Sequence, residues 1–420
     1  MASPLRATLK RLLPRSAKQI VFRMRETIAQ PPIDDVVLAD YRFAPEDGVT
    51  PRLNLVIPNL TVATAFGGVT TGIAIFLEIA KVLSAERKWD LRVILTDPDS
   101  ETSEDIFRAR EARILGSSAS SFLRITGRSQ QVPVRKLDMF VAYNWWASLN
   151  VLPLIDAQAA HFLHPVRPLL YLVQEYEPHL MAFSSAHVLA REAYDTPRRL
   201  WAVINSSNLN EYFKLQGHSA EQSWVFEPVI DSKLRPYLDR VGSSPRGKQI
   251  LVYGRPGIAR NCFPALIRGL RKWAADYPEF RDWTVISAGT EHKPVPLGDG
   301  RAVNSVGKLS LEDYAETLLT SSVGISLMAS PHPSYPPLEM AHFGVRTITN
   351  GYLCKDLGPF HPNIRSVNSM GSAQLSEALS EACRASLASP PSAERNPVYT
   401  RDEAYPFIAD LAAAITSELA

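Results

Sequence analysis

Residues 330–344 carry the sequence SPHPSYPPLEMAHFG and lie between two apolar runs, at residues 323–329 and 345–349. Apolar runs of this length, bounded by loop residues, predict strands buried in a parallel sheet. The stretch between them predicts a proline-rich loop and a short helix over residues 338–343, ended by Gly344. A loop leading into the amino end of a helix presents backbone N–H groups and the positive end of the helix dipole. We therefore expect an anion such as a diphosphate to bind here.

The predicted helix contains residues with distinct roles. Pro336 and Pro337 suit the first turn of a helix, where a missing backbone N–H costs nothing. Glu339 lies inside the helix, and its carboxylate could accept hydrogen bonds from two sugar hydroxyls. The alternative is that Glu339 is a surface carboxylate on an ordinary helix. Both interpretations leave the carboxylate outside the core.

The chain has 420 residues, which is too long for one core and fits two domains of ordinary size. Its hydrophobic content of 45% and charged content of 21% are typical of a soluble globular protein. A formal net charge of +2 argues against a nucleic-acid-binding protein. The three cysteines lack the paired spacing of a metal site or a disulfide framework, which favours a reducing cytoplasm. No apolar run reaches the roughly 18 residues of a membrane span.

Residues 1–30 differ in composition from the rest of the chain. Lys and Arg residues precede the first acidic residue, Glu26, and apolar residues recur at a near-helical spacing that Pro14 interrupts. A basic amphipathic helix is typical of a segment that lies on an anionic membrane surface, here the inner face of the plasma membrane. The alternative is a helical extension that packs on the body of the protein. Residues 1–50 are thus predicted to be an extension and a connector.

A nucleotide-binding pattern opens the first domain, which is predicted over residues 51–230. An apolar strand at residues 53–57 leads to Gly67 and Gly68, and a helical pattern follows. Glycine has no Cβ, so the backbone can approach a ligand that the amino end of the helix also faces. The two glycines fit a plain tight turn equally well.

A later strand of this domain, at residues 169–173, is followed by two carboxylates, Glu175 and Glu177. Ligands of open α/β sheets bind beyond the carboxyl ends of the strands, so both residues are well placed for chemistry. Glu175 is the nearer of the two to the strand end. The alternative is a carboxylate held in a salt bridge on a loop.

The second domain, predicted over residues 231–400, repeats the alternation of strands and helices. Its first strand lies at residues 249–253 and is followed by Arg255. Lys308 stands after a later strand, just before a predicted helix.

Residues 330–344 resemble the donor-binding signature of the retaining glycosyltransferases of family 4. The variant PSYPPLEMAHFG is similar to a narrower group, the WsaF-like rhamnosyltransferases, and the similarity covers most of residues 52–370. It implies an α/β chain with the GT-B fold, in which two Rossmann-like domains face each other across a cleft. It also implies a hinge at residues 226–236 and a final helix, within residues 401–420, that crosses back to the first domain.

The resemblance implies roles for residues of the second domain. Glu339 would clasp the ribose of a nucleotide sugar, with Ser334 and Tyr335 also binding substrate. Arg255 and Lys308 would grip the diphosphate, since a planar guanidinium takes two phosphate oxygens and an ammonium acts as a point charge.

Further roles follow for the first domain. Gly67 and Gly68 would lie across the cleft from the donor phosphates, and Glu175 would orient or deprotonate the acceptor hydroxyl. Two positions depart from the family pattern. Pro331 replaces the first of two usual glutamates, and Arg260 stands near the place of a usual Lys.

The function so implied is transfer of a hexosyl unit, rhamnosyl from dTDP-L-rhamnose, to a hydroxyl of a growing surface glycan. We expect retention of configuration, no metal and no other cofactor. The partners would be the nucleotide-sugar donor, a glycan or lipid-linked glycan acceptor, and an anionic membrane through residues 1–30, with no nucleic acid.

Two alternatives remain. Asp97 and Asp99 follow a strand with the Asp-x-Asp spacing of the metal-dependent GT-A transferases, although an ordinary turn is favoured because the glycine loop and the Glu339 helix do not belong to that fold. The absence of the first glutamate leaves room for a non-catalytic subunit that binds a glycan or a nucleotide.

Overall fold

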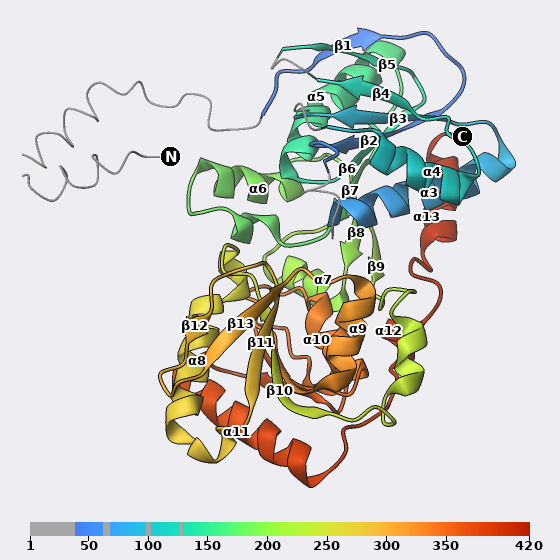
Figure 1. The fold of residues 1–420 in the computed structure, drawn as a ribbon. Helices are drawn as coiled ribbons and strands as arrows, with labels where there is room; N and C mark the ends of the chain where they lie inside the picture. The colour runs from blue at the N-terminus through green and yellow to red at the C-terminus, as the bar shows by residue number, and fades with distance from the viewer. Residues whose placement is uncertain (1–37, 62–67, 98–101, 126–128) are drawn as a thin grey trace, which may run out of the picture. The chain divides into compact units, whose positions relative to one another are not determined.

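A computed structural model describes residues 38–61, 68–97, 102–125 and 129–420. The predicted membrane segment, Gly67 and Asp99 lie outside these residues, so the hypotheses about them stay predictions. Within residues 39–420, the described residues form two seven-stranded sheets and one two-stranded sheet (Figure 1).

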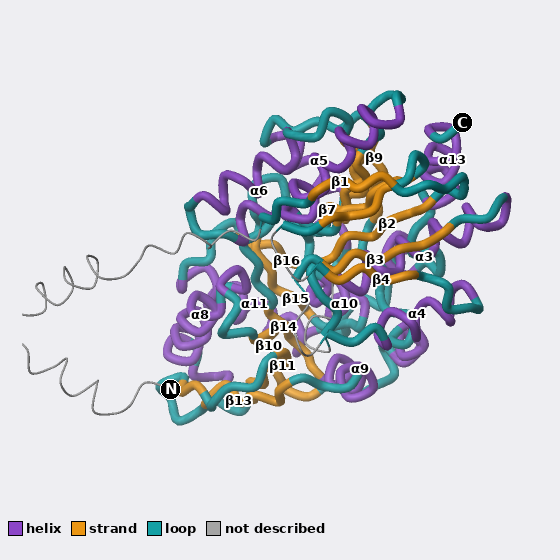
Figure 2. Tube along the Cα trace, turned by 90° about the horizontal axis from the view of Figure 1, so that it is seen from above, coloured by secondary structure: helices purple, strands orange, loops and turns teal. Residues whose placement is uncertain are grey.

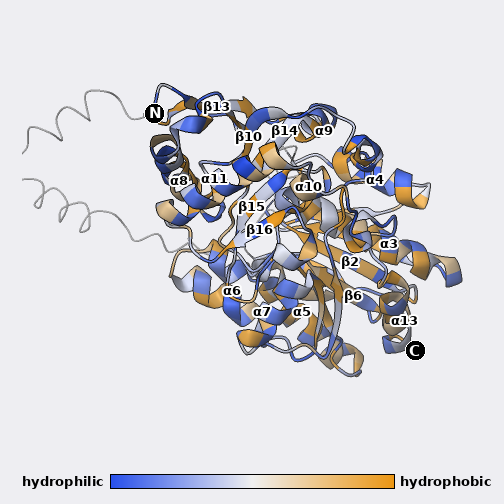
Figure 3. Cartoon of the chain, turned by 90° about the horizontal axis from the view of Figure 1, so that it is seen from below, coloured by the Kyte–Doolittle hydropathy of each residue, from blue (hydrophilic) through white to orange (hydrophobic). Residues whose placement is uncertain are grey.

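The first large sheet is entirely parallel and has the strand order β4-β3-β2-β6-β7-β8-β9. Four of its strands are buried along their whole length, because both faces of the sheet are covered by helices. Figure 3 shows β2 and β6 in the colour of apolar residues. The strands are β2 (Arg52–Ile57), β3 (Asp90–Leu95), β4 (Ser121–Arg124), β6 (Asp138–Ala142), β7 (Leu169–Val173), β8 (Leu200–Asn205) and β9 (Gln222–Phe226). The helices are α3 (Gly68–Glu86), α4 (Asp105–Leu115), α5 (Trp145–Phe162), α6 (Ser185–Asp195) and α7 (Ser207–Leu215).

The last helix of the chain, α13 (Ile408–Glu418), packs on the first sheet's helix α3. Phe407, Ile408 and Leu411 lie in the same apolar cluster as residues of α3 and β2. Glu418 at its end pairs with Arg199 at 2.7 Å. The C-terminal segment therefore contributes to the core of the first domain.

By length and composition, helix α3 is long and apolar enough to cross a membrane. No segment of this kind was expected from the sequence. Its buried residues, among them Ile73, Phe76 and Leu83, pack in the core beneath the first sheet. The apolar character of α3 is thus accounted for by core packing, because helices buried on more than one side need apolar residues around most of their circumference.

The second large sheet has the order β12-β13-β11-β10-β14-β15-β16, and only the short β12 runs antiparallel to its neighbour. Its strands are β10 (Gly247–Gly254), β11 (Thr284–Gly289), β12 (Val295–Pro296), β13 (Ala302–Gly307), β14 (Ser321–Ile325), β15 (Arg346–Asn350) and β16 (Ile364–Val367). The helices are α8 (Phe263–Asp276), α9 (Leu311–Thr320), α10 (Tyr335–His342) and α11 (Ser372–Ala388), followed by the short α12 (Pro397–Thr400).

Alternate residues of β10 enter different cores of the second domain. Ile250 and Val252 pack with α8 and α11, whereas Leu251 packs with α9 and α10. This two-residue period is that of a strand covered on both faces. Figure 2 shows the two helix pairs on opposite sides of the sheet.

The predicted end of α10 is confirmed. Gly344 has φ 78°, a left-handed value that glycine adopts without steric cost. The backbone N–H of Gly344 donates to Ala341 O and that of Val345 to Met340 O, the two bonds of a Schellman motif. The beginning differs from expectation, because α10 starts at Tyr335 and so includes both prolines in its first turn.

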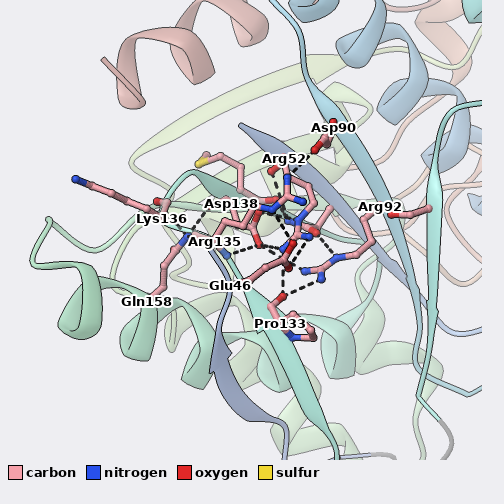
Figure 4. Close-up of polar contacts among 12 residues, drawn as sticks. Glu46, Arg52, Asp90, Arg92, Pro133, Arg135, Lys136, Asp138 and Gln158 are labelled. Carbon is pink, nitrogen blue, oxygen red and sulfur yellow. Dashed lines mark hydrogen bonds and ion pairs between the residues drawn. The ribbon is translucent and has the colours of Figure 1, made fainter. Parts of the chain in front are cut away.

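A small sheet that the sequence did not predict joins β1 (Arg42–Pro45) to β5 (Gln131–Val134) in parallel. It covers a buried charge network at the amino ends of β2, β3 and β6 (Figure 4). Asp138 is fully buried and accepts two hydrogen bonds from Arg52, at 2.9 and 2.7 Å. Arg92 lies 3.5 Å from the same carboxylate, and Glu46 bridges Arg52 and Arg135 at 2.9 and 2.8 Å. The network fixes this end of the first domain, opposite the carboxyl ends of the strands.

Candidate active site

Glu175 connects the two large sheets at their carboxyl ends. It follows β7 and is partly buried, and its Oε1 accepts a hydrogen bond of 2.5 Å from Ser330 Oγ, in the loop after β14. The same oxygen accepts a bond of 3.0 Å from the backbone N–H of Tyr176. A carboxylate of the first domain is therefore held against the loop that opens α10 in the second.

The protonation of Glu175 depends on opposing influences. Burial raises its pKa, while the hydrogen bonds from Ser330 and from the Tyr176 backbone lower it. The positive charges of Arg260 and Lys355 lower it further. Burial is the largest of these influences and the pKa of Glu175 is raised on balance, although two cations of the second domain favour the ionised form.

Glu177 is held differently. Its Oε2 accepts bonds from the Tyr171 hydroxyl at 2.5 Å and from the backbone N–H of Trp145, at the start of α5, at 2.6 Å. Burial, partly offset by these bonds, raises its pKa to about 8. Glu177 thus ties helix α5 to β7, and Glu175 is the carboxyl that faces the second domain.

Gly68 lies at the start of α3, where a side chain would not fit. A Cβ there would stand 2.6 Å from the hydroxyl of Tyr143, which follows β6. The glycine thus lets the amino end of α3 approach the tyrosine ring closely, beside the end of β7. This is the same edge of the first sheet that carries Glu175.

Side chains of the loop before α10 accept hydrogen bonds from backbone N–H groups of the same loop. Ser330 Oγ accepts from the N–H of His332 at 2.9 Å, and His332 Nδ1 accepts from the N–H of Ser334 at 3.0 Å. Pro336 and Pro337 have no N–H to offer. The expectation of several free N–H groups at this helix end is therefore wrong for most of the loop, and side chains must supply the contacts to an anion.

Ser334 has φ 68° and ψ 151°, a backbone conformation that L-residues rarely adopt. Strain of this kind costs about 1–3 kcal/mol and persists where the surrounding structure holds it, often at functional sites. Ser206, which begins α7 at the end of β8, has a similar conformation with φ 99° and ψ 147°. Ser334 directly precedes α10, which begins at Tyr335, and Ser206 directly precedes α7. The Tyr335 hydroxyl faces Asn205 and Thr71.

Glu339 is half-buried, which corrects the expectation that its carboxylate lies outside the core. Its Oε2 accepts a hydrogen bond of 3.0 Å from the Tyr314 hydroxyl of α9. Burial raises its pKa to about 7, and the negative charge of Asp231 adds to the effect, while the Tyr314 hydroxyl opposes it. A carboxylate in this state gains from a ligand that donates hydrogen bonds to it.

We expect Glu339→Gln to be at least as stable as the parent chain at pH 8. The pKa of Glu339 rises from 4.5 to about 7 on folding, so the folded state holds more protons over this range and the free energy of unfolding falls as the pH rises. Glutamine cannot titrate, so its advantage should shrink towards pH 5. Thermal melting of both proteins at the two pH values checks this. A variant that melts well below the parent at pH 8 would mean that the charged form is the one the fold requires.

The predicted phosphate-binding residues lie at the carboxyl edge of the second sheet. Arg255 directly follows β10 and is half-exposed, and Lys308 follows β13 and is exposed. Arg260 stands near the position where the family usually has a Lys. Its positive charge acts on Glu175, Tyr143 and His332. Of these cations, Arg260 is the one whose charge reaches the carboxyl end of β7.

The alternative metal site receives no geometric support. Asp97 is exposed after β3, and in the part of the chain that the structure describes no group of three or more His, Cys, Asp or Glu side chains is arranged to hold a metal ion.

Two models of one protein family match this chain. The WsaF N-terminal domain matches residues 52–207 and the WsaF C-terminal domain matches residues 248–380. The chain belongs to the WsaF family. Both matched regions contain residues of the candidate site, Glu175 in the first and Glu339 in the second.

A curated relative of this WsaF-family chain is the O-antigen biosynthesis protein RfbC of Myxococcus xanthus. The two are 28% identical over 288 residues, which is 68% of this chain and 21% of the relative. The chain therefore spans about a fifth of the length of the curated relative it matches.

Solved structures confirm the predicted fold. Sucrose-phosphate synthase from Thermosynechococcus elongatus superimposes with a TM-score of 0.51 at 11% identity, covering 88% of this chain and 99% of that one. The lipopolysaccharide outer core galactosyltransferase WaaB, without ligand, gives 0.50 at 12% identity, covering 87% and 99%. The WsaF-family chain has the GT-B fold, with parallel sheets in two domains.

Three candidate residues of this WsaF-family chain, Glu175, Arg255 and Lys308, follow strands as the sequence predicted, and their role in a site stays a prediction. His332 and Lys355 are also buried, the charge of Arg260 acts on His332, and neither residue was predicted from the sequence. Lys355 carries no sequence signal. His332 precedes a proline, but so do His164 and His361, so the pattern His-Pro-x does not single it out.

Proposed function

We propose that this chain is a glycosyltransferase that moves a hexosyl unit from a nucleotide sugar to a hydroxyl of a growing glycan. Within that activity we propose rhamnosyl transfer from dTDP-L-rhamnose, with retention of configuration and without metal. The observation that carries the proposal is the contact of Glu175 with Ser330. It holds a carboxylate of the first domain against the loop that opens α10, where the charges of Arg260 and Lys355 of the second domain act on it.

The division of labour follows from the chemistry of the side chains. Glu339 accepts hydrogen bonds from donor hydroxyls, in the place of the bond it now receives from Tyr314. Arg255 and Lys308, with Arg260 near Glu175, offset the negative charge that grows on the leaving diphosphate. Fixed charges of this kind stabilise a transition state by several kcal/mol in general. Because side chains supply this charge, the proposal needs no divalent cation.

Glu175 acts on the acceptor side. Burial raises the pKa of Glu175, and the charges of Arg260 and Lys355 oppose that shift. In its ionised form the carboxylate can accept a hydrogen bond from an acceptor hydroxyl and orient it. In a retaining transfer the leaving phosphate can take the acceptor proton, so Glu175 assists and is not the sole base. The name of the curated relative supports a glycan as acceptor.

The test is transfer from a panel of nucleotide sugars, including dTDP-L-rhamnose, to water and to glycan acceptors, with and without EDTA. We expect turnover that EDTA leaves unchanged. Loss of turnover with EDTA, restored by a divalent cation, would favour the metal-dependent alternative. Binding of a nucleotide sugar without any transfer or hydrolysis would favour the non-catalytic subunit.

Glu339→Gln should weaken affinity for the donor by about 10–150-fold, since losing a hydrogen bond to a charged group costs about 1.5–3 kcal/mol. The thermal shift caused by the nucleotide sugar measures this, because a ligand that binds the folded state raises its melting temperature. Glu316→Gln, at an exposed carboxylate of α9, is the control. Equal shifts for parent and Glu339→Gln would place the nucleoside elsewhere.

A further inference from the structure

His332 and His361 occupy the same local motif in two loops of the second domain. In each, a proline follows the histidine, and the next residue donates its backbone N–H to the histidine Nδ1. The distances are 3.0 Å for Ser334 to His332 and 3.1 Å for Asn363 to His361. Both rings are buried, with 5% and 2% of their surface exposed.

The shared bond fixes the tautomer of both rings. A backbone N–H can only donate, so Nδ1 of each histidine must be the acceptor. Burial lowers the pKa of both histidines, to about 3 for His332, so both rings are neutral at pH 7. A neutral ring whose Nδ1 accepts must carry its proton on Nε2. Each motif therefore presents one Nε2–H donor.

The two donors differ in what they meet. His361 Nε2 lies 2.8 Å from the carbonyl oxygen of Glu394. His332 Nε2 is buried and has no hydrogen-bond partner among the residues that the structure describes. A buried donor without an acceptor costs about 1–3 kcal/mol. The motif at His361 thus shows which group is missing at His332: an oxygen at hydrogen-bond distance from Nε2.

The surroundings of His332 define the chemistry of that oxygen. The positive charges of Lys355 and Arg260 both act on the His332 ring. Lys355 is 1% exposed, and the hydrogen bond found for its Nζ goes to the carbonyl of Met328, at 2.9 Å. Glu175 is the carboxylate on which both cations act. Lys355 and Arg260 carry two positive charges, and Glu175 carries at most one negative charge. The net positive charge around the neutral His332 suits an anionic oxygen.

We propose that His332 Nε2–H and the Lys355 ammonium, next to Arg260, bind a phosphate oxygen of the substrate. Under the proposed glycosyl transfer, this phosphate belongs to the diphosphate of the nucleotide-sugar donor. Only this identity of the phosphate rests on the proposed function. A phosphate carried by the acceptor offers the same oxygen chemistry. His332 and Lys355 are therefore binding residues of the site, added to the residues already assigned to it.

The test uses substitutions that separate the two ring nitrogens. His332→Asn keeps an oxygen near the place of Nδ1, which can accept from the Ser334 N–H, and removes the Nε2–H donor. Lys355→Met removes the charge, and the Met328 carbonyl still accepts from Asn350 and from the Ser330 N–H. His361→Asn is the matched control, because it makes the same change in the same motif where the donor already meets a carbonyl. Melting temperatures establish that each variant is folded at the assay temperature.

Calorimetric titrations with pyrophosphate, dTDP and farnesyl diphosphate are the measurement. We expect His332→Asn and Lys355→Met to weaken binding by about tenfold to hundredfold, and His361→Asn to bind like the parent. A loss confined to dTDP and pyrophosphate assigns the subsite to the donor, whereas a loss confined to farnesyl diphosphate assigns it to the acceptor.

Either of two results would overturn the proposal: a parent chain that binds none of the three probes, or a His332→Asn variant that binds them all like the parent. The transfer assay is a separate arm. Absence of transfer with intact, His332-dependent binding of the probes would contradict the proposed function and leave the phosphate subsite standing.

Discussion

Asp138→Asn should lower the free energy of unfolding of the first domain by about 3–5 kcal/mol, the cost of removing one partner from a buried ion pair. Asp138 is fully buried and receives both a two-pronged bond from Arg52 and the charge of Arg92. Asparagine has nearly the same shape but no charge, so two guanidinium groups would remain buried with less compensation. Denaturant unfolding followed by tryptophan fluorescence measures the effect, since five of the seven tryptophans lie in the first domain.

Asp282→Asn is the matched control, because Asp282 pairs with Lys248 on the exposed surface of the second domain. Exposed pairs contribute about 0–1 kcal/mol, so this variant should unfold close to the parent. If Asp138→Asn also stayed within about 1 kcal/mol of the parent, Glu46 and Asp90 would carry enough of the charge balance to make Asp138 dispensable.

The sequence predicted the large sheets well because their strands are buried on both faces. Residues 53–57 and 249–253 are apolar runs, and each lies inside an observed strand, β2 and β10. The small sheet was not predicted, because β5 contains Pro133 and β1 has the mixed sequence RFAP. Both patterns are unfavourable for a strand. The stability of this sheet comes from pairing in three dimensions and from the charge network below it, which no local pattern records.

The site was predictable in part for a similar reason. Strand ends in a parallel sheet share one edge, so Glu175 and Arg255 could be placed from the order of the pattern alone. The burial of Glu339 could not, because it depends on Tyr314 from a neighbouring helix. The cation Lys355 follows β15 without any motif, and only the fold brings it to the carboxylate after β7.

Arg255→Ala should lower kcat/KM with the nucleotide sugar by roughly 10²-fold or more, as expected when a charge-assisted phosphate contact is removed. The backbone before Arg255 is tightly fixed, since a Cβ on Gly254 would stand 1.9 Å from Ser287 Oγ. The Arg255 side chain itself is half-exposed and makes no hydrogen bond or ion pair within the described residues, so its loss should leave the melting temperature nearly unchanged. A large kinetic effect without a stability effect is therefore the expected signature.

Arg268→Ala, at an exposed position of helix α8, changes the net charge by the same amount and serves as the control for long-range electrostatics. Its kcat/KM should stay close to that of the parent, because salt screens interactions between solvent-exposed charges. If both residues hold the diphosphate, Lys308→Ala should lower kcat/KM as Arg255→Ala does. If both variants bound the donor like the parent, the diphosphate would be held without them, by Arg260 and Lys355 where the carboxyl ends of the two sheets meet.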